Sequence, residues 1–385
     1  MKSWLFFVFV CAFTVPSLAS AAPLKSTLEI SGWMPYWRTA TSTQDVLPHL
    51  DSLTTVHPFG YTLTEEGILF DALVIHDEPW PSFIAAARAK RVRVIPTVMS
   101  GNGELLHKLL SNYESRIKLE DDITALVMEN NFDGIDIDFE AKLVETKPYF
   151  SLFLKGLYQR MGKKWVYCTI ESRTPISSRY PNGNAPADAG VYSNDYVAIN
   201  KYCDRVQLMV YDQGQVDRKL SAAATGPYAP VADPLWAKKV VTLAAQTISK
   251  RKLVLGVPTY GYEWAVTPLL EKGYEYDLLW SFNPRYALEF AASHGLVPER
   301  NIAGELSFTY SPSMPTSTPM TLGVPTAATA VGPALAERQP FNIMWWSDSI
   351  SVAQKIGIAK ELGIRGVAIF KFDGGEDQRI WDVLK

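Results

Sequence analysis

The chain has 385 residues, of which 47% are hydrophobic and 12% aromatic, so it can bury a sizeable core. This length suits one large barrel with an insertion, or two ordinary domains. The formal net charge of -3 at pH 7 excludes strong non-specific attraction to nucleic acid, and we expect no nucleic-acid partner.

The first segment, residues 1–21, has the composition of a secretory signal peptide. Lys2 gives it a charged start, residues 4–15 an apolar middle, and residues 17–22 a mostly small-residue run suited to cleavage after Ala21. The apolar run is too short to span a bilayer comfortably, so we expect no stable membrane insertion. We predict a secreted or periplasmic mature protein that starts at residue 22.

Strand-like alternation and helix-like periodicity follow one another along most of the mature chain. Barrel strands are predicted at residues 28–33, 53–61, 92–99, 133–140, 165–170, 205–211, 252–257 and 366–371. Helices are predicted at residues 81–90, 121–130, 150–161, 234–249, 284–294 and 349–362. Eight strands with intervening helices favour an α/β fold of the (β/α)8 TIM-barrel type over a doubly wound sheet, although periodicity alone does not separate the two.

The barrel rhythm stops between residues 262 and 341. This stretch combines a helical segment (284–294), a strand (306–310) and a Ser/Thr/Pro-rich run (311–325), as expected of an inserted α+β subdomain with a loop. The chain resumes with a strand at 342–346. We therefore predict one domain over residues 22–385, with a small insertion at 262–341 between strand 7 and the last helix.

The most informative segment is residues 133–140, with the sequence DGIDIDFE. Its apolar residues recur at every second position, which predicts a strand rather than a helix. Asp136, Asp138 and Glu140 then line one face, roughly 6.6 Å apart at about 3.3 Å of rise per residue. Such a row is costly to bury fully ionised, so a shared or retained proton should raise the pKa of Glu140, its outermost member. A carboxyl group that stays protonated near neutral pH can act as a general acid.

Two other interpretations of this segment remain open. A calcium-binding loop places oxygen ligands at alternate positions, but Ile and Phe do not separate its ligands. An edge strand can carry acids for solubility, but the apolar neighbours here are those of a buried strand. The pattern favours a row of carboxylates that ends in a cleft.

The DGIDIDFE segment resembles the D-G-x-D-x-D-x-E signature of glycoside hydrolase family 18, which includes chitinases and peptidoglycan-cleaving glucosaminidases on a (β/α)8 barrel. The resemblance implies that Glu140 is the catalytic acid and that Asp138 orients the acetamido group of the substrate. Asp136 is expected to share a proton with Asp138. Asp133 has the opposite parity, and we expect it to be structural.

A second segment, residues 207–212 with the sequence QLMVYD, resembles the Q-x-M-x-Y-D element of the same family. Alternation places Gln207, Met209 and Tyr211 on one face. The resemblance implies that the Tyr211 hydroxyl holds the acetamido oxygen. Without the first motif, a buried and hydrogen-bonded tyrosine would be the preferred interpretation.

Aromatic residues cluster where the predicted strands finish, which suggests a surface for stacking sugar rings, although a single ring is more often part of the core. We expect substrate contacts from Trp33, Tyr61, Met209, Asp212, Trp264 and Phe370. Most family members have Trp where this chain has Phe370, so sugar binding there is expected to be weaker or altered. Asn102 replaces the first paired Gly of the family's S-x-G-G element, which leaves the local backbone conformation in question.

The resemblance implies a retaining glycosidase that uses substrate-assisted catalysis on glycans containing β-linked N-acetylglucosamine, and we expect it to be secreted. The segment order, including residues 196–206 and 345–348, most resembles the bacterial spore-cortex and peptidoglycan glucosaminidases, but chitin remains an alternative substrate. A non-catalytic glycan-binding lectin on the same scaffold is the alternative function. We expect a monomer. We also expect no cofactor and no metal, because no nucleotide-binding, HExxH or Cys/His pattern is present.

After signal cleavage the chain keeps two cysteines, Cys168 and Cys203. An oxidising compartment would permit one disulfide, but two cysteines in a chain of this length say little, because buried free thiols are common. We expect free thiols, although the sequence does not decide the matter.

Overall fold

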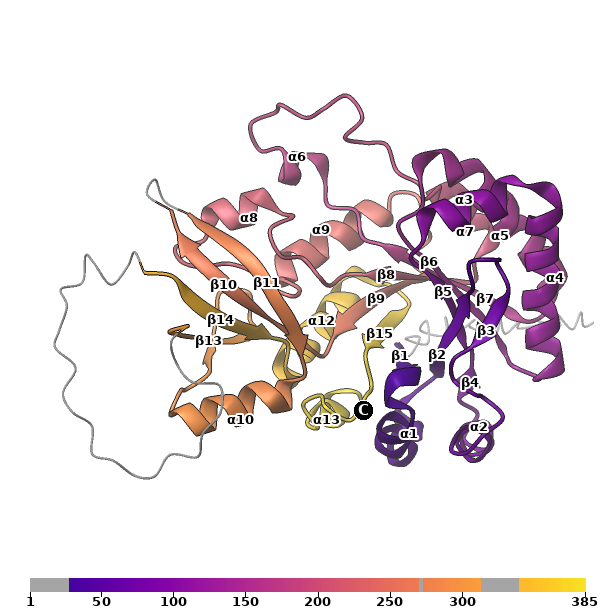
Figure 1. Ribbon diagram of the computed structural model, residues 1–385, viewed down its shortest axis with the longest axis horizontal. Coiled ribbons are helices and arrows are strands. Elements are labelled where there is room, and N and C mark those ends of the chain that lie inside the picture. The colour runs from indigo at the N-terminus through magenta and orange to yellow at the C-terminus, as the bar shows by residue number, and fades with distance from the viewer. Residues whose placement is uncertain (1–27, 270–272, 313–338) are drawn as a thin grey trace, which may run out of the picture.

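Residues 28–269, 273–312 and 339–385 are described by a computed structural model. The predicted signal peptide at 1–21 lies outside these residues, as does most of the Ser/Thr/Pro-rich run at 311–325. Figure 1 shows a larger part, the barrel, beside a smaller part built around a second sheet.

Eight parallel strands form a closed barrel, because β1 pairs in parallel with both β2 and β15. The strands are β1 (Glu29–Pro35), β2 (Thr55–Leu63), β5 (Thr97–Ser100) preceded by the short β4 (Arg93–Val94), β6 (Gly134–Phe139), β7 (Trp165–Glu171), β8 (Arg205–Met209), β9 (Leu253–Pro258) and β15 (Gly366–Phe370). A further short strand, β3 (Leu69–Asp71), pairs antiparallel with β2. The predicted (β/α)8 TIM barrel is confirmed.

Helices lie around the barrel and in its connections (Figure 1). They are α1 (Thr39–Val46), α2 (Trp80–Ala89), α3 (Gly103–Ser111), α4 (Tyr113–Glu129), α5 (Lys147–Met161), α6 (Ile176–Arg179), α7 (Tyr196–Tyr202), α8 (Arg218–Ala223), α9 (Pro234–Ala244), α12 (Ser349–Leu362) and α13 (Ile380–Val383). Three 3-10 turns, η1 (Tyr36–Arg38), η2 (Leu47–Ser52) and η3 (Val144–Thr146), lie in loops between them.

The helix α4 begins earlier than the sequence pattern predicted. Asn112 caps it, since its side-chain oxygen accepts a hydrogen bond from the Ser115 N–H (3.0 Å). Asp121 and Asp122 therefore lie inside the helix, and the prediction that they open it is wrong. Asp121 instead accepts a hydrogen bond from Arg160 on α5 (2.6 Å).

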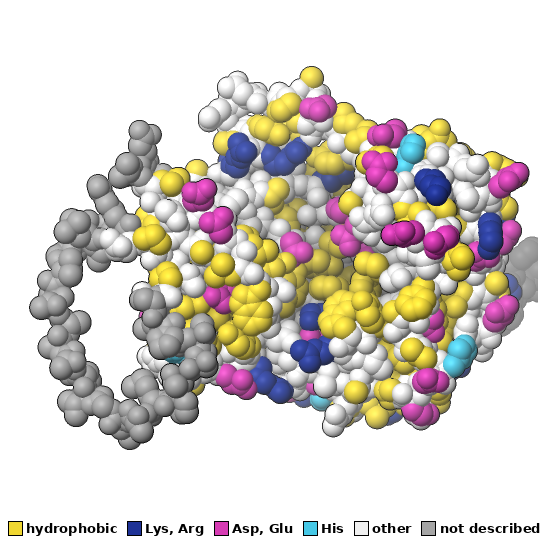
Figure 2. Space-filling view, viewed as in Figure 1, with side chains coloured by type: hydrophobic (Ala, Val, Ile, Leu, Met, Phe, Trp, Pro, Cys, Tyr) yellow, Lys and Arg dark blue, Asp and Glu magenta, His cyan; other side chains and the backbone are white. Residues whose placement is uncertain are grey.

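The second sheet lies in the chain between β9 and α12. Its strands are ordered β11 (Tyr274–Phe282), β10 (Gly261–Pro268), β14 (Phe341–Trp346), β13 (Leu306–Tyr310) and β12 (Glu299–Arg300), all antiparallel, and α10 (Pro284–His294) belongs to the same part. An α+β insertion after strand 7 was predicted and is confirmed. The strand predicted at 342–346 is β14, which pairs within this sheet and not with the barrel. Figure 2 shows a hollow between the two parts.

Glu305 joins the second sheet to the barrel. Its fully buried carboxylate accepts hydrogen bonds from the backbone N–H groups of Val231 (2.9 Å) and Ala232 (3.0 Å), in the loop before α9. It also accepts from the indole of Trp345 (2.7 Å) and lies 3.7 Å from the ammonium of Lys355 on α12. The insertion is thus held by buried polar contacts as well as by its two chain connections.

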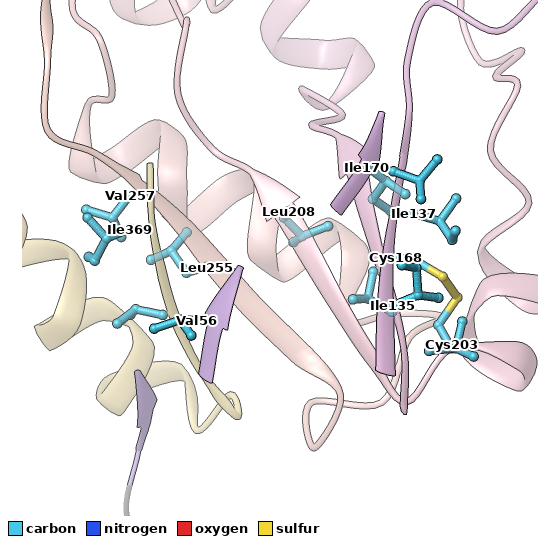
Figure 3. Close-up of a cluster of buried hydrophobic side chains, with 14 of the residues drawn as sticks. Val56, Ile135, Ile137, Cys168, Ile170, Cys203, Leu208, Leu255, Val257 and Ile369 are labelled. Atoms are coloured by element: carbon cyan, nitrogen blue, oxygen red, sulfur yellow. A yellow bond between two sulfur atoms is a disulfide. The ribbon is translucent and has the colours of Figure 1, made fainter. Parts of the chain in front are cut away.

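The main core lies between the barrel and its helices. Ile135, Ile137 and Phe139 of β6 point outward into it and are fully buried, as the alternation of that strand predicted. Figure 3 shows Ile135 and Ile137 close to Cys168 of β7. The opposite face of β6, which carries the aspartates, therefore points into the barrel.

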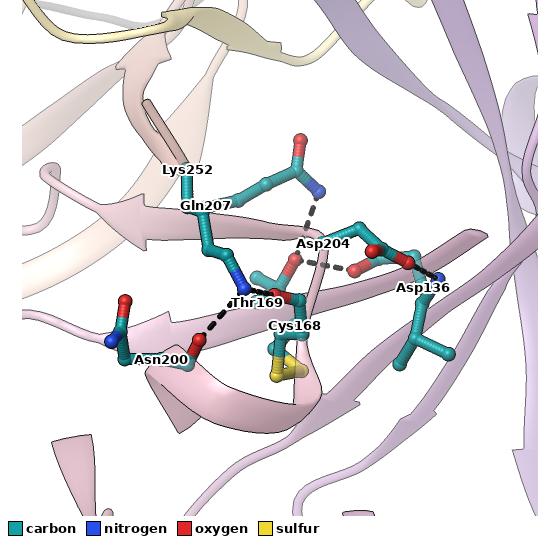
Figure 4. The surroundings of a disulfide bond; sticks show 9 residues. Asp136, Cys168, Thr169, Asn200, Asp204, Gln207 and Lys252 are labelled. Atoms are coloured by element: carbon teal, nitrogen blue, oxygen red, sulfur yellow. Dashed lines mark hydrogen bonds between the residues drawn. A yellow bond between two sulfur atoms is a disulfide. The ribbon is translucent and has the colours of Figure 1, made fainter. Parts of the chain in front are cut away.

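Cys168 and Cys203 form a disulfide, so the expectation of free thiols is wrong. Cys168 lies on the outward face of β7, and Cys203 is the residue that ends α7, with a Cα–Cα distance of 6.0 Å. The bond ties that strand to the helix beside it (Figure 4). Its formation depends on how α7 packs against the barrel, which the spacing of cysteines does not reveal.

Candidate active site at the carboxyl ends of the barrel strands

Asp136 lies at the centre of a polar network inside the barrel. It is fully buried and accepts hydrogen bonds from the hydroxyls of Thr97 and Thr169 (both 2.8 Å) and from the indole of Trp33 (3.0 Å). The amide of Gln207 donates in turn to Thr169 (3.1 Å), as Figure 4 shows. Four strands thus fix the orientation of this carboxylate.

Asp138 lies one step nearer the carboxyl end of β6. It is 4% exposed, and its Oδ1 atom has no hydrogen-bond partner among the described residues. Burial, followed by the nearby charges of Glu140 and Asp136, raises the pKa of this carboxyl well above its ordinary value. Asp138 is therefore suited to holding a proton, or to sharing one with Asp136.

Glu140 is the first residue after β6 and is only partly buried. Its N–H donates to the carbonyl of Ser100 (2.8 Å), which fixes the backbone at this point. Burial raises the pKa of Glu140, and the charges of Glu171 and Asp212 raise it further. A partly exposed carboxyl with a raised pKa at the end of a barrel strand can donate a proton to a ligand.

Glu171, at the end of β7, supports the segment that follows Glu140. Its carboxylate accepts hydrogen bonds from the Ala141 N–H (3.0 Å) and from the amide of Asn194 (2.7 Å), and it lies 3.6 Å from the buried ammonium of Lys142. Ala141 has a φ of 51°, a left-handed conformation that is uncommon for a residue with a side chain. Sequence analysis missed this support, although Glu171 shares the inward parity of Thr169 on a barrel strand.

Close packing also fixes the other side of this segment. A Cβ atom on Gly103 would lie 2.2 Å from the carbonyl oxygen of Ala141, so only glycine fits there. Asn102, the departure from the family pattern, has an ordinary φ of -96° and caps α3 by accepting from the Leu105 N–H (3.0 Å). The Asn102 substitution therefore leaves the loop beside Glu140 unstrained.

Tyr211 and Phe370 stack on each other near the aspartate row. Their ring centroids lie 5.3 Å apart with an angle of 18° between the planes. Burial raises the pKa of the Tyr211 hydroxyl well above its ordinary value, and the charge of Asp138 adds to the effect. The hydroxyl therefore keeps its proton and remains a hydrogen-bond donor. Phe370 also contacts the edges of Trp33 and Tyr260.

A cavity of about 610 Å³ lies between the barrel and the second sheet (Figure 2). It is lined by Trp37, Arg38, Asp212, Tyr260, Tyr262, Trp280, Ser281, Phe282, Asn283, Tyr286, Phe370 and Lys371. None of the predicted catalytic residues lines it; Phe370, which stacks on Tyr211, and Asp212, whose charge acts on Glu140, connect it to the carboxylate row. Asp212 accepts hydrogen bonds from the hydroxyls of Tyr260 and Tyr262 (2.6 Å for Tyr262). Exposed aromatic rings beside a row of carboxylates are typical of a sugar-binding cleft.

The comparison with known families agrees with this geometry. Residues 33–375 match the sequence model described as glycosyl hydrolases family 18. The chain belongs to this family. Membership identifies it as a glycoside hydrolase with a polysaccharide substrate.

Known relatives cover most of the chain at low identity. The uncharacterized glycosylase YvbX of Bacillus subtilis (strain 168) is 22% identical over 345 residues, which is 87% of each protein. The cortical fragment-lytic enzyme of Bacillus anthracis is 23% identical over 289 residues, and the match spans 72% of this chain but 55% of that longer protein. The crystal structure of the spore cortex-lytic enzyme SleL from Bacillus megaterium QM B1551 has a TM-score of 0.67 at 19% identity, covering 94% of this chain and 74% of that one.

Four of the residues predicted to contact substrate do not line the cavity of this family 18 chain. Trp33 is 1% exposed and lies against Asp136. Tyr61 is 2% exposed within the main core. Met209 and Trp264 are half-buried, and Trp264 packs on other rings of the second sheet. Direct sugar contact by these four residues stays a prediction.

Three aromatic residues that were not singled out as site residues lie in the cleft instead. Trp37, Trp280 and Tyr286 line the cavity and are 47%, 42% and 37% exposed. Trp37 lies just after β1, where the sequence predicted that aromatic residues gather at strand ends, whereas the other two come from the insertion, where no motif marks them.

The described residues contain no candidate metal site. Within residues 28–269, 273–312 and 339–385, no group of three or more His, Cys, Asp or Glu side chains is arranged to hold a metal ion. No helix in the same ranges is long and apolar enough to cross a membrane.

Proposed function

We propose that this family 18 chain is a secreted, retaining glycosidase that cleaves glycans containing β-linked N-acetylglucosamine, with the acetamido group of the substrate as nucleophile. The observation that carries the proposal is the graded exposure of one carboxylate row. Asp136 is fully buried, Asp138 is 4% exposed, and only Glu140 is partly open beside the cleft. Glu140 is thus the acid available to the glycosidic oxygen, while Asp136 and Asp138 act from deeper inside the barrel.

In the first step Glu140 gives its proton to the glycosidic oxygen as the bond to the anomeric carbon breaks. The acetamido oxygen attacks that carbon and forms an oxazolinium-like ring, which needs no carboxylate nucleophile from the protein. Water then adds to the anomeric carbon, and Glu140, now ionised, takes up the proton of that water. The acid is restored, and the configuration of the sugar is retained.

The other residues act on the acetamido group. Asp138, with its unpartnered Oδ1, accepts the acetamido N–H and balances the positive charge that develops on the ring. Asp136 exchanges a proton with Asp138 from a position fixed by Thr97 and Thr169. The protonated hydroxyl of Tyr211 donates to the acetamido oxygen and aligns it for attack.

The first test compares wild type with Glu140→Gln on N-acetylglucosamine oligomers and on purified peptidoglycan. Gln keeps the size of the side chain but cannot donate the required proton, so we expect the release of reducing ends to fall at least about a hundredfold. Glu145→Gln, at an exposed glutamate in η3, is the matched control. Near-normal turnover by Glu140→Gln would contradict the assigned acid, and binding without release by wild type would indicate a lectin.

A second substrate distinguishes the acetamido group of the substrate from a carboxylate of the protein as the nucleophile. An oligomer in which the acetamido group at the cleaved sugar is replaced by a hydroxyl cannot form the oxazolinium-like ring. We expect no cleavage of that oligomer by wild type. Cleavage at a normal rate would argue for a carboxylate nucleophile of the protein.

The secretion proposal rests on the composition of residues 1–21. Expression of the full chain in a bacterial host should give an exported protein whose first residue is Ala22, as read by N-terminal sequencing. Retention of Met1 in the recovered protein would contradict it.

A further inference from the structure

The cleft extends beyond the cavity beside the carboxylate row. A second hollow of about 220 Å³ shares Arg38, Asn283 and Tyr286 with that cavity and adds Arg285 and Glu289 of α10. One wall is the loop after β1, and the other is the insertion. A glycan that reaches Glu140 can therefore continue along this surface.

The cleft is lined by charged groups of both signs. Arg38, Lys371 and Asp212 line the larger cavity. The second hollow is lined by Arg38 and Arg285 together with Glu289 and Asp373. Figure 2 shows Lys and Arg side chains at both the upper and the lower part of the hollow.

Two of these basic groups keep their charge available to a ligand. The guanidinium of Arg38 is exposed and makes no hydrogen bond or ion pair within the described part of the chain. Arg285 donates to the carbonyl of Gly374 (3.2 Å) and forms no ion pair with any described residue. Lys371 differs, because the buried carboxylate of Asp373 is paired with it.

The arginines stand beside rings that can hold a sugar. Trp37 precedes Arg38, and Tyr286 follows Arg285, so each guanidinium is next in sequence to an exposed ring that lines the cleft. A sugar on these rings presents its substituents to the arginines. Guanidinium groups bind carboxylates with paired, planar hydrogen bonds, which a neutral sugar does not use.

We propose that Arg38 and Arg285 form a subsite for a carboxylate carried by the glycan, so that the preferred substrate is an N-acetylglucosamine polymer with acidic substituents. This inference rests on the proposed glycosidase function and narrows its substrate class from neutral chitin to an acidic glycan such as peptidoglycan. The carboxylate has two chemical sources: the lactyl ether of the muramic sugar, or the peptide attached to it.

The test measures kcat/KM for wild type and for Arg38→Gln/Arg285→Gln on three substrates: neutral N-acetylglucosamine oligomers, peptidoglycan strands with their peptides, and strands freed of peptide. We expect the double variant to lower the ratio of acidic-strand to neutral-oligomer kcat/KM about tenfold, the scale of lost charged hydrogen bonds. The lactyl carboxyl is an amide wherever a peptide is attached, so loss only on strands freed of peptide assigns the lactyl carboxylate. Loss only on peptide-bearing strands assigns a carboxylate of the peptide, and loss on both strand types means that the subsite accepts either. An unchanged ratio overturns the subsite.

Two controls separate this proposal from the underlying function. Arg251→Gln removes an exposed arginine that precedes β9, at the opposite end of the barrel, and should leave the ratio unchanged. Dissociation constants for the same three ligands, measured in the Glu140→Gln background by calorimetry, report the subsite without hydrolysis. Wild type that binds acidic strands through these arginines but cuts no substrate would refute the glycosidase and keep the subsite.

Discussion

The backbone around Glu140 fixes its position, and neighbouring charges raise its pKa. Its own N–H and that of Ala141 are held by Ser100 and Glu171, so the side chain leaves a fixed point at the edge of the cleft. Glu171 is also a negative charge close enough to raise the pKa of Glu140. Geometry and acidity of the proposed acid therefore depend on the same carboxylate.

Replacing Glu171 by Gln should separate the two effects. The amide oxygen can still accept from Ala141, but the like charge is gone, so the pKa of Glu140 falls. Because the acid must be protonated to act, the alkaline limb of the kcat/KM profile should move to lower pH. The profile is measured for wild type, Glu171→Gln and the exposed control Glu145→Gln. If Glu171→Gln lowers kcat/KM equally at every pH and the alkaline limb does not move, Glu171 has only a structural role.

Parity explains which site residues the sequence predicted. The alternation of β6 placed Asp136, Asp138 and Glu140 on one face and the isoleucines on the other. Depth within the barrel was not predictable, because it depends on neighbouring strands: Trp33 and Tyr61 end up beneath the surface. Cleft residues from the insertion were missed because their position depends on how that part packs against the barrel.

At the scale of elements, the disulfide links β7, which carries Thr169 and Glu171, to α7. It closes a loop with a sequence separation of 35 residues. A cross-link of this length restricts the unfolded chain and stabilises the fold by roughly 4 kcal/mol. It lies on the helix-facing side of the barrel, away from the carboxylates.

The double substitution Cys168→Ala/Cys203→Ala should therefore lower the free energy of unfolding by about 4 kcal/mol. We expect kcat at 25 °C to stay close to wild type, since neither sulfur contacts the cleft. Urea unfolding of the variant, and of wild type with and without reductant, gives the measurement. If reductant leaves the stability of wild type unchanged, the bond does not form in solution.

The start of a helix could be predicted where the sequence shows a residue that caps it. Asp233 accepts from the Leu235 N–H (2.6 Å) and starts α9 as predicted. For α4 the acidic pair at 121–122 was a misleading signal, since Asn112 supplies the cap. The strand predicted at 92–99 is divided into β4 and β5 around Ile95 and Pro96, because proline cannot donate to the ladder.

An ion-pair network joins barrel strands from both halves of the chain, at the end of the barrel opposite the cleft. Glu29 of β1 accepts hydrogen bonds from Arg205 of β8 (2.6 and 2.8 Å) and from Arg365 (2.7 Å), and Arg93 of β4 lies 3.4 Å away. Burial would raise the pKa of Glu29, but the hydrogen bonds from Arg205 and Arg365 outweigh it and lower the pKa to about 2. Strands from both halves of the chain meet at this carboxylate.

A folded-state pKa below the ordinary value of 4.5 means that Glu29 stabilises the fold above that pH and loses its contribution as the pH falls towards 2. The difference corresponds to about 3 kcal/mol. Glu29→Gln should therefore unfold more easily at pH 7, and its deficit relative to wild type should shrink between pH 4.5 and 2. Urea unfolding across this range, with the exposed Glu129→Gln as control, measures it. A deficit that stays constant with pH would contradict the pKa argument.

The overall fold was predictable because strand and helix periods alternate regularly from residue 28 to the seventh strand. The number of strands favoured a barrel but did not prove closure, which the pairing of β1 with both β2 and β15 shows. The strand order of the second sheet did not follow from period alone. Its strand β14 reads like a barrel strand, and only its pairing with β10 and β13 assigns it to the insertion.

The buried polar contacts of Glu305 affect the thermodynamics of glycan binding. Because this carboxylate and two chain connections hold the second sheet against the barrel, the wall that carries Trp280 and Tyr286 is ordered before a ligand arrives. A flexible glycan must surrender its own conformational freedom on binding, but it does not have to order the protein as well. The entropic penalty then falls mainly on the sugar chain, and affinity should depend on how stiff that chain is in solution.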